Sequence, residues 1–181
     1  MRPIYRPPWR IDLTIREGVR PPIAAAVLAR AIVAALEAAG APSPASIGLI
    51  LSDDAELAAL NRAHLGHHGP TDVLSFPLLP PGAFPAHDGE PADRRVGAGA
   101  APFALPPGRR PHLGDIVVSM ERAIEQAVEG RGGHTGTVRW SPADELRLLV
   151  IHGALHISGW DHALPAEESS MRAVERRLLQ S

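Results

Sequence analysis

Residues 141–162 constrain the fold of this chain more than any other segment. They begin with Ser-Pro-Ala-Asp, in which serine suits the N-cap of a helix and proline suits the first helical position. Residues 146–157 are apolar nearly all round, which predicts a helix covered on every side by other elements. Gly159 can adopt the left-handed conformation that ends a helix and turns the chain back. We therefore expect the rest of the chain to fold around this helix.

Segments of alternating or mainly apolar residues, bounded by turn residues, predict the strands of one sheet. The predicted strands are 11–15, 45–51, 71–76 and 113–119. Helix start and stop signals predict four further helices. These are residues 23–39, a helix capped by Ser52 that ends near His64, residues 120–129, and residues 165–179. This order indicates an α+β fold with one mixed sheet of about four strands packed with helices.

The length of 181 residues is that of one ordinary domain, and we expect a single domain over 1–181. Residues 77–111 hold nine prolines and five glycines with almost no periodicity. We therefore interpret residues 78–111 as a long, mobile loop inserted at the surface. Its arginines could contact a polyanion, although a solvated insertion is the simpler interpretation. They are Arg94, Arg95, Arg109 and Arg110.

Composition narrows the chemistry that is open to the chain. Cysteine is absent, so a tightly bound transition metal would have to rely on histidine and carboxylate ligands. The net charge of −2 does not indicate a nucleic-acid partner by itself. The first ten residues lack the apolar run of a signal peptide, and no stretch approaches the roughly 20 apolar residues of a membrane span. A cytoplasmic location is the expectation.

Three histidines lie in the most informative segment. His152 and His156 are four residues apart on the expected helix, so their side chains project from the same face. His162 follows the helix-ending Gly159 and can return to supply a third nitrogen. Three imidazoles with a fourth position open are typical of a catalytic zinc site, whereas hydrogen-bonded core histidines would each need separate partners. We therefore predict a metal site at these three residues.

This spacing also matches the histidines and glycine of the metzincin protease pattern. Gly153, however, stands where those proteases have the glutamate that acts as general base. Peptide cleavage is therefore the less favoured interpretation. Asp161 is the nearest carboxylate in the motif; it is a candidate proton acceptor, or it could orient an imidazole through a hydrogen bond.

The stretch H-G-A-L-H-I-S-G-W-D-H resembles the HGxLHLxGyDH signature of the YbeY family, the bacterial rRNA maturation factors and endoribonucleases. Two other segments agree: Leu60-Asn61 followed by P-T-D-V-L-S-F-P at 70–77, and L-G-D-I-V-V-S at 113–119. The resemblance covers nearly the whole chain except the proline-rich insertion. It implies a zincin-like fold in which one zinc ion is held by His152, His156 and His162.

The resemblance also implies an activity and partners. It implies a zinc-dependent, single-strand-specific endoribonuclease that matures the 3′ end of small-subunit rRNA and acts in ribosome quality control. Single-stranded RNA and the small ribosomal subunit would be its partners, and neither a membrane nor DNA is expected as a partner. Many family members have an arginine where this chain has Leu65, so a phosphate-binding role for that arginine does not carry over. Another basic residue would have to supply it.

Two other functions stay open at this point, an assembly factor of the ribosome with a mainly structural zinc ion and a metalloprotease.

Further side chains are weaker candidates for the site. Asp72 and Asp115 could line a cleft, or they could have a structural role at the end of a strand or in a turn. Trp160 could stack on a base, or it could pack below the loop that carries His162. Met171 is expected in the core. Two clusters could contact substrate or lie in loops. They are His64, His67 and His68, and Arg131, His134 and Arg139.

Overall fold

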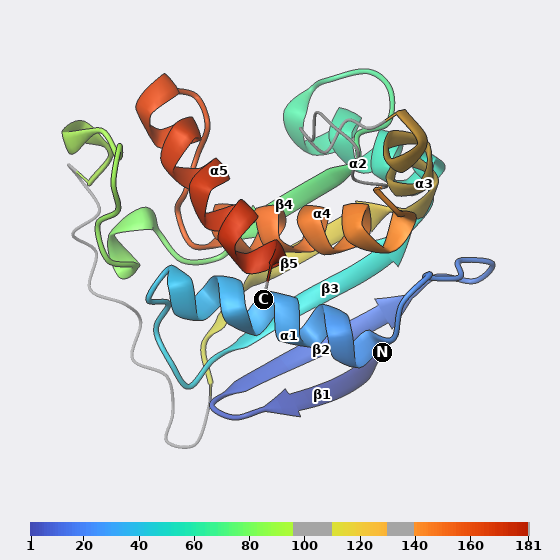
Figure 1. Cartoon of the computed structure of the whole chain (residues 1–181), viewed down its shortest axis with the longest axis horizontal. Helices are drawn as coiled ribbons and strands as arrows, with labels where there is room; N and C mark the ends of the chain where they lie inside the picture. Colours follow the sequence, from blue (N-terminus) through green and yellow to red (C-terminus); the bar gives the residue numbers. More distant parts are fainter. Residues whose placement is uncertain (96–109, 130–139, 181) are drawn as a thin grey trace.

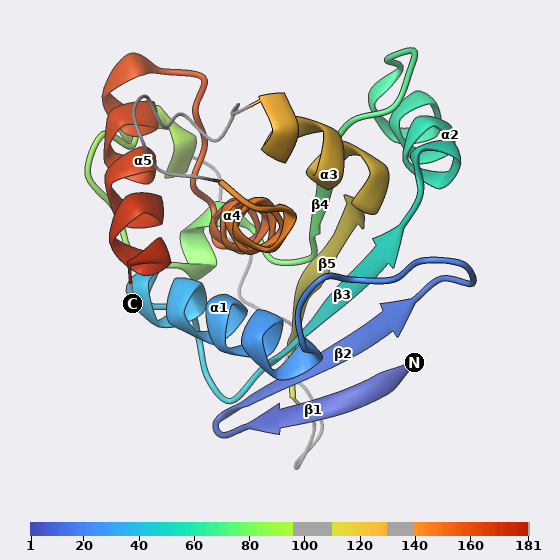
Figure 2. The ribbon, with the colours of Figure 1, turned by 45° about the vertical axis from the view of Figure 1, so that its right-hand side comes forward.

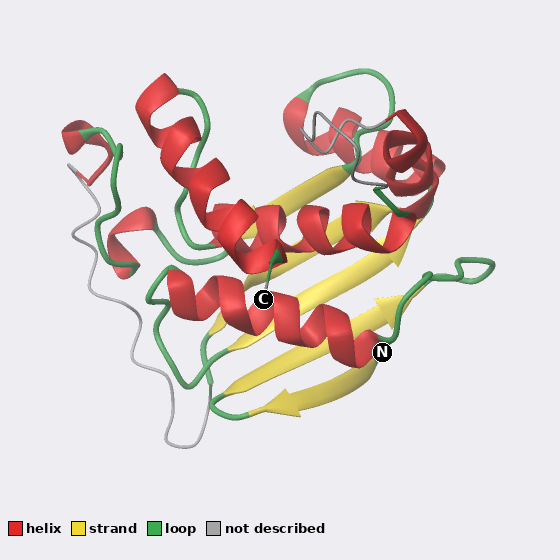
Figure 3. Cartoon of the chain, in the orientation of Figure 1, coloured by secondary structure: helices red, strands yellow, loops and turns green. Residues whose placement is uncertain are grey.

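One mixed sheet of five strands forms the centre of the chain (Figures 1 and 3). The computed structural model describes residues 1–95, 110–129 and 140–180. The strand order is β1-β2-β3-β5-β4, with β2, β3 and β5 parallel and the two edge strands antiparallel to their neighbours. The strands are β1 (Arg2–Arg6), β2 (Trp9–Ile15), β3 (Ser46–Ser52), β4 (Val73–Pro77) and β5 (His112–Ser119).

The α+β fold with one mixed sheet is confirmed, with five strands instead of about four. The additional strand, β1, lies at the edge of the sheet and pairs with β2, so that Ile4 lies opposite Ile11. Most of its residues are exposed, and Ile4 is its only apolar residue packed against the core. Such a strand carries little hydrophobic pattern, which is why the sequence did not predict it.

In the described part of the chain, five α-helices cover the sheet. They are α1 (Ala25–Ala38), α2 (Asp54–Leu65), α3 (Met120–Glu129), α4 (Pro142–Ile157) and α5 (Pro165–Leu179). Figure 2 looks along α4 and shows it between the sheet and the helices α1, α3 and α5. The helix α2 lies on the other side of the sheet, where Leu57 packs against Leu74 and Val117. The expectation of a buried central helix is confirmed.

The two ends of α4 follow the predicted signals. The Ser141 hydroxyl accepts the backbone N–H of Asp144, whose carboxylate accepts the N–H of Ser141, a reciprocal capping box. At the other end Gly159 has φ 88°, in the left-handed region. Both ends are therefore fixed by local sequence, and the apolar residues between them, such as Leu146 and Ile151, are fully buried.

The start of α2 corrects one prediction. Its N-cap is Asp53, whose carboxylate accepts the backbone N–H of Glu56 at 2.9 Å. Ser52 is instead the last residue of β3, and its hydroxyl donates to the Glu56 carboxylate. Both residue types suit an N-cap, and the parallel pairing of β3 with β5 extends the strand through Ser52.

Part of the proline-rich segment packs against the core where the structure describes it. Residues 78–95 contain two 3₁₀ turns, Pro81–Ala83 and Ala92–Arg95, and Phe84 is only 3% exposed in the hydrophobic core. Phe84 therefore ties this part to the core, and the inserted loop over 78–111 stays a prediction. Arg94 is paired with a carboxylate, Arg110 donates to the carbonyl oxygen of Pro8 at 2.8 Å, and Arg109 lies outside the described residues.

No helix in the described ranges has both the length and the apolar character that crossing a bilayer requires.

Candidate metal centre

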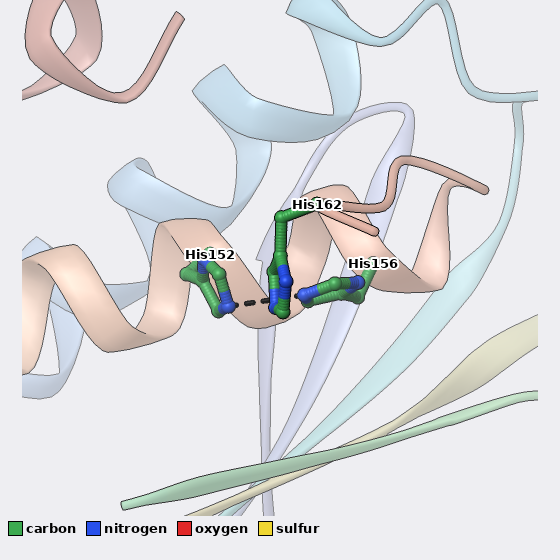
Figure 4. Close-up of side chains that lie close together, drawn as sticks. All are labelled: His152, His156 and His162. Carbon is green, nitrogen blue, oxygen red and sulfur yellow. Dashed lines mark hydrogen bonds between the residues drawn. The ribbon is translucent and has the colours of Figure 1, made fainter. Parts of the chain in front are cut away.

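The imidazoles of His152, His156 and His162 converge on one point (Figure 4). The Nε2 atoms of His152 and His156 are 3.0 Å apart. One ring nitrogen of each histidine lies within 4.8 Å of the others, and the ring centroids are 4.5 to 5.6 Å apart. The predicted juxtaposition is therefore present in the folded chain.

Local structure explains how the three rings meet. His152 and His156 lie one turn apart on α4, and both rings project from the same side of that helix. The N–H groups of Gly159 and Trp160 then bond back to the carbonyl oxygens of His156 and Leu155, at 3.0 and 3.1 Å. This closed turn returns the chain so that His162 faces the other two rings.

The donor set fits a divalent transition metal. Two nitrogens bound to a tetrahedral zinc ion at 2.0–2.1 Å would be about 3.3–3.4 Å apart, close to the 3.0 Å separation seen here. Neutral imidazoles suit zinc, copper and nickel better than calcium or magnesium. Among the described residues, only these three form a group that could hold a metal ion.

Glu175 on α5 orients the first of these rings. Its Oε1 lies 2.7 Å from Nδ1 of His152, and the glutamate is only 9% exposed. A carboxylate accepts the Nδ1–H, which places the lone pair of His152 on Nε2, toward the metal position. Sequence reasoning missed this residue, although a glutamate four residues after the buried Met171 on an amphipathic helix is a detectable signal.

The electrostatic setting keeps His156 ready to bind a cation. Burial and the neighbouring imidazoles of His152 and His162 lower the pKa of His156 to about 4. The ring is therefore neutral near pH 7, which is the form that donates a lone pair to a metal.

Close packing explains the glycine at position 153. A Cβ atom there would lie 2.6 Å from Cγ2 of Ile116 and 3.2 Å from the hydroxyl of Ser75. The residue faces the sheet, and its carbonyl oxygen accepts the Ser75 hydroxyl at 3.2 Å. This helix position therefore has no room for the glutamate that zinc proteases carry.

A pocket of about 720 Å³ opens above the histidines. Its wall is formed by β4, the end of α4, the turn that follows it, and part of the proline-rich segment. Leu65 lines it from the end of α2, and Arg94 lines it from the proline-rich segment. The charged side chains along the wall are Asp72, Arg94 and Asp161.

The two acidic candidates on this wall differ. The Asp72 carboxylate accepts the Val73 N–H at 2.8 Å and the Gln126 amide at 3.0 Å, so it supports the start of β4. The Asp161 side chain is 44% exposed, and its Oδ1 accepts the backbone N–H of His162 at 2.8 Å. No hydrogen bond joins Asp161 to an imidazole of the three histidines within the described part of the chain.

Most of the other candidate residues do not line the pocket. Asp115 does not line the pocket and lies 3.0 Å from Nε2 of His112. Trp160 is 8% exposed and does line the pocket, whereas Met171 is buried at 1%, as expected. His64 packs on Phe76, and neither it nor its two neighbours lines the pocket. Arg131, His134 and Arg139 lie outside the described residues.

The fold and site together define an α+β protein with three histidines that could hold a metal ion and that line a pocket. A model of the Endoribonuclease YbeY family matches residues 18–181. The chain belongs to this family, so the resemblance stated from the sequence is confirmed.

Individual relatives agree. The chain is 36% identical over 175 residues to the Endoribonuclease YbeY of Roseiflexus sp. (strain RS-1), covering 94% of this chain and 93% of that protein. It is 42% identical over 147 residues to the Endoribonuclease YbeY of Salinispora tropica, covering 81% and 80%. The solution structure of TM1509 from Thermotoga maritima shares its fold, with a TM-score of 0.51 at 22% identity over 94% of this chain and 87% of that one.

Proposed function

We propose that this chain is a zinc-dependent endoribonuclease that hydrolyses phosphodiester bonds in single-stranded RNA. The observation that carries the proposal is the convergence of His152, His156 and His162 on one point at the base of an open pocket. Membership of the Endoribonuclease YbeY family supports the choice of substrate. When bound there, a zinc ion would polarise a phosphoryl oxygen and acidify water.

The chain's own residues hold this arrangement in place. His152 is oriented by Glu175, His156 is kept neutral by burial, and both stand on a helix that packs against the sheet and three other helices. His152, His156 and His162 line the pocket, so a metal held by them would be within reach of a phosphate and a water molecule that enter it.

Asp161 is our candidate for the proton acceptor. It lines the pocket beside His162, its side chain is half-exposed, and its Oδ2 is 3.5 Å from the nearest nitrogen of Arg94. A carboxylate in this position can take a proton from water that attacks a phosphate in the pocket. Position 153 cannot serve, because it is glycine and faces the sheet.

The shape of the pocket favours single-stranded substrate. A volume of about 720 Å³ lies in the range that accepts groups of ligand size, such as a nucleotide. Single strands can present unstacked bases to a pocket, whereas paired strands keep their bases stacked inside a helix. We extend the proposal to the 3′ end of small-subunit rRNA and to the small ribosomal subunit as partner, on the resemblance to the YbeY signature.

The test compares substrates with and without a chelator. We expect the purified chain to cut single-stranded RNA, with cleavage lost on chelation, restored by Zn²⁺ and absent in His156→Ala. His68→Ala, which changes an exposed histidine away from the pocket, is the matched control and should cleave normally. Intact RNA beside digested unfolded protein would favour a metalloprotease. No cleavage of either substrate, with co-sedimentation on ribosomal particles, would favour an assembly factor.

A further inference from the structure

The third histidine differs from the other two in how the chain supports it. His152 and His156 stand on α4, whose backbone hydrogen bonds fix their positions. His162 is exposed and lies between α4 and α5, in a segment with no helix or strand. The turn at Gly159 returns the chain toward the other rings, so the place of His162 also depends on the contacts that hold this turn.

Glu167, in the first turn of α5, is the centre of those contacts. It is fully buried, and its Oε1 accepts the backbone N–H of Asp161 at 2.9 Å. Asp161 in turn accepts the N–H of His162 at 2.8 Å. A chain of two hydrogen bonds therefore links the buried carboxylate to the backbone of the third histidine.

Arg94 reaches the same carboxylate from the proline-rich segment. Its two terminal nitrogens contact the two oxygens of Glu167, one of them at 2.7 Å. The same guanidinium donates to the carbonyl oxygen of Gly159 at 3.3 Å and lies 3.5 Å from Oδ2 of Asp161. One arginine thus touches the turn at Gly159, the residue before His162, and the first turn of α5.

The segment that carries Arg94 is held against the same turn. The ring of His87 stacks on Trp160 with centroids 4.0 Å apart, and its Nε2 is 2.8 Å from Oε1 of Glu167. A Cβ atom at Gly89 would lie 2.6 Å from the backbone nitrogen of Glu167, so the two backbones touch. Phe84 anchors the segment in the core.

The charges in this network agree with the geometry. Burial alone would raise the pKa of Glu167, but hydrogen bonds from Arg94, His87 and the Asp161 N–H together lower it below its ordinary value. Hydrogen bonding to Glu167 raises the pKa of Arg94 in return. Glu167 is therefore a carboxylate that accepts three partners, and losing its guanidinium would leave a buried charge short of a counterion.

We propose that Arg94 and Glu167 are positioning residues that hold the turn carrying His162 in place to complete the metal site. In this arrangement residues 84–94 form a strap across that turn. The strap fixes the third ligand before the metal arrives, so the chain does not have to order it on binding. This inference rests on the metal site of the proposed function.

The test measures metal affinity without reference to RNA. Zn²⁺ binding to Arg94→Ala, Arg94→Lys and the unmodified chain is compared by competition with a chromophoric chelator. We expect Arg94→Ala to bind zinc about tenfold to hundredfold more weakly, as for other residues that orient metal ligands. Arg94→Lys should recover part of the loss, because lysine keeps the charge but not the two-pronged contact. Arg172→Ala, which breaks an exposed ion pair with Glu168 on the same helix, should bind as the unmodified chain does.

A second variant covers the case in which Arg94→Ala does not fold. Arg94→Met with Glu167→Gln removes the buried charge together with its partner, and circular dichroism of the metal-free protein checks its fold. Weakened zinc binding by this folded protein supports the strap, and unchanged binding overturns it. If the unmodified chain itself binds no zinc, the strap and the metal site fail together. Tight binding that is equal in all folded variants overturns the strap alone.

Discussion

The carboxylate of Glu175 lies 2.7 Å from Nδ1 of His152, which joins α5 to the metal position on α4. Because this contact sets the direction of the ring, its loss should weaken metal binding without removing a ligand. We expect Glu175→Ala to lower the affinity for Zn²⁺ about tenfold to hundredfold. Glu168→Ala changes an exposed glutamate on the same helix and is the control. Equal affinity for the two variants in a chelator competition would show that Glu175 does not support the site.

RNA binding should depend on the metal as strongly as cleavage does. Among the described residues of the pocket wall, Asp72 and Asp161 oppose a polyanion and Arg94 is already paired with Glu167. The pocket wall without a metal therefore attracts phosphate only weakly. A bound divalent cation would make the net electrostatic interaction with phosphate attractive. We expect chelation to weaken binding of a fluorescent single-stranded RNA at least about tenfold at fixed salt. Fluorescence anisotropy measures it, and binding that is unchanged by the chelator would contradict the expectation.

The metal-free protein should lose stability in acid through His156. Its pKa is about 4 in the folded chain, while in the unfolded chain it returns to about 6.5. Between these values the unfolded chain binds the proton and the folded chain does not, so the free energy of unfolding falls as pH is lowered. The loss should reach about 3 kcal/mol by pH 4. Urea denaturation with chelator present, for the unmodified chain and His156→Gln, should show a smaller pH dependence in the variant; identical curves would refute this.

Gly153→Ala should destabilise the fold, although alanine ordinarily favours a helix over glycine. The added methyl group would lie 2.6 Å from Cγ2 of Ile116, and crowding of this kind costs about 1–3 kcal/mol. Chemical denaturation measures the loss. Ile116→Ala removes the Cγ2 atom that the new methyl group would meet. Gly153→Ala should therefore lower the free energy of unfolding less in the Ile116→Ala variant than in the unmodified chain. A stabilising effect of Gly153→Ala in the unmodified background would show that the helix can move away from the sheet.

The parts of the site that follow local rules were predictable from sequence. The four-residue spacing of His152 and His156 brings two rings together on any helix, and Gly159 adopts the positive φ that its position required. Burial of α4 followed from the apolar residues around its axis. These features need no knowledge of the rest of the fold.

The supporting residues were not predictable in the same way. Glu175 is 23 residues from His152, and Arg94 is 73 residues from Glu167, so each pair meets only after the sheet and helices have assembled. Arg94 also lies in a segment whose prolines hide any periodic pattern. The edge strand β1 was not predicted for a related reason. It is a strand because it pairs with β2, and its own sequence has little hydrophobic pattern.

X-ray absorption at the zinc edge of the purified, zinc-loaded protein would show whether the three histidines share one ion. We expect one zinc ion per chain with three imidazole nitrogens at about 2.0–2.1 Å and one further oxygen. The histidine contribution should fall to two rings in His162→Ala. A spectrum with four protein donors, or a bound ion whose imidazole count does not change in that variant, would contradict the account.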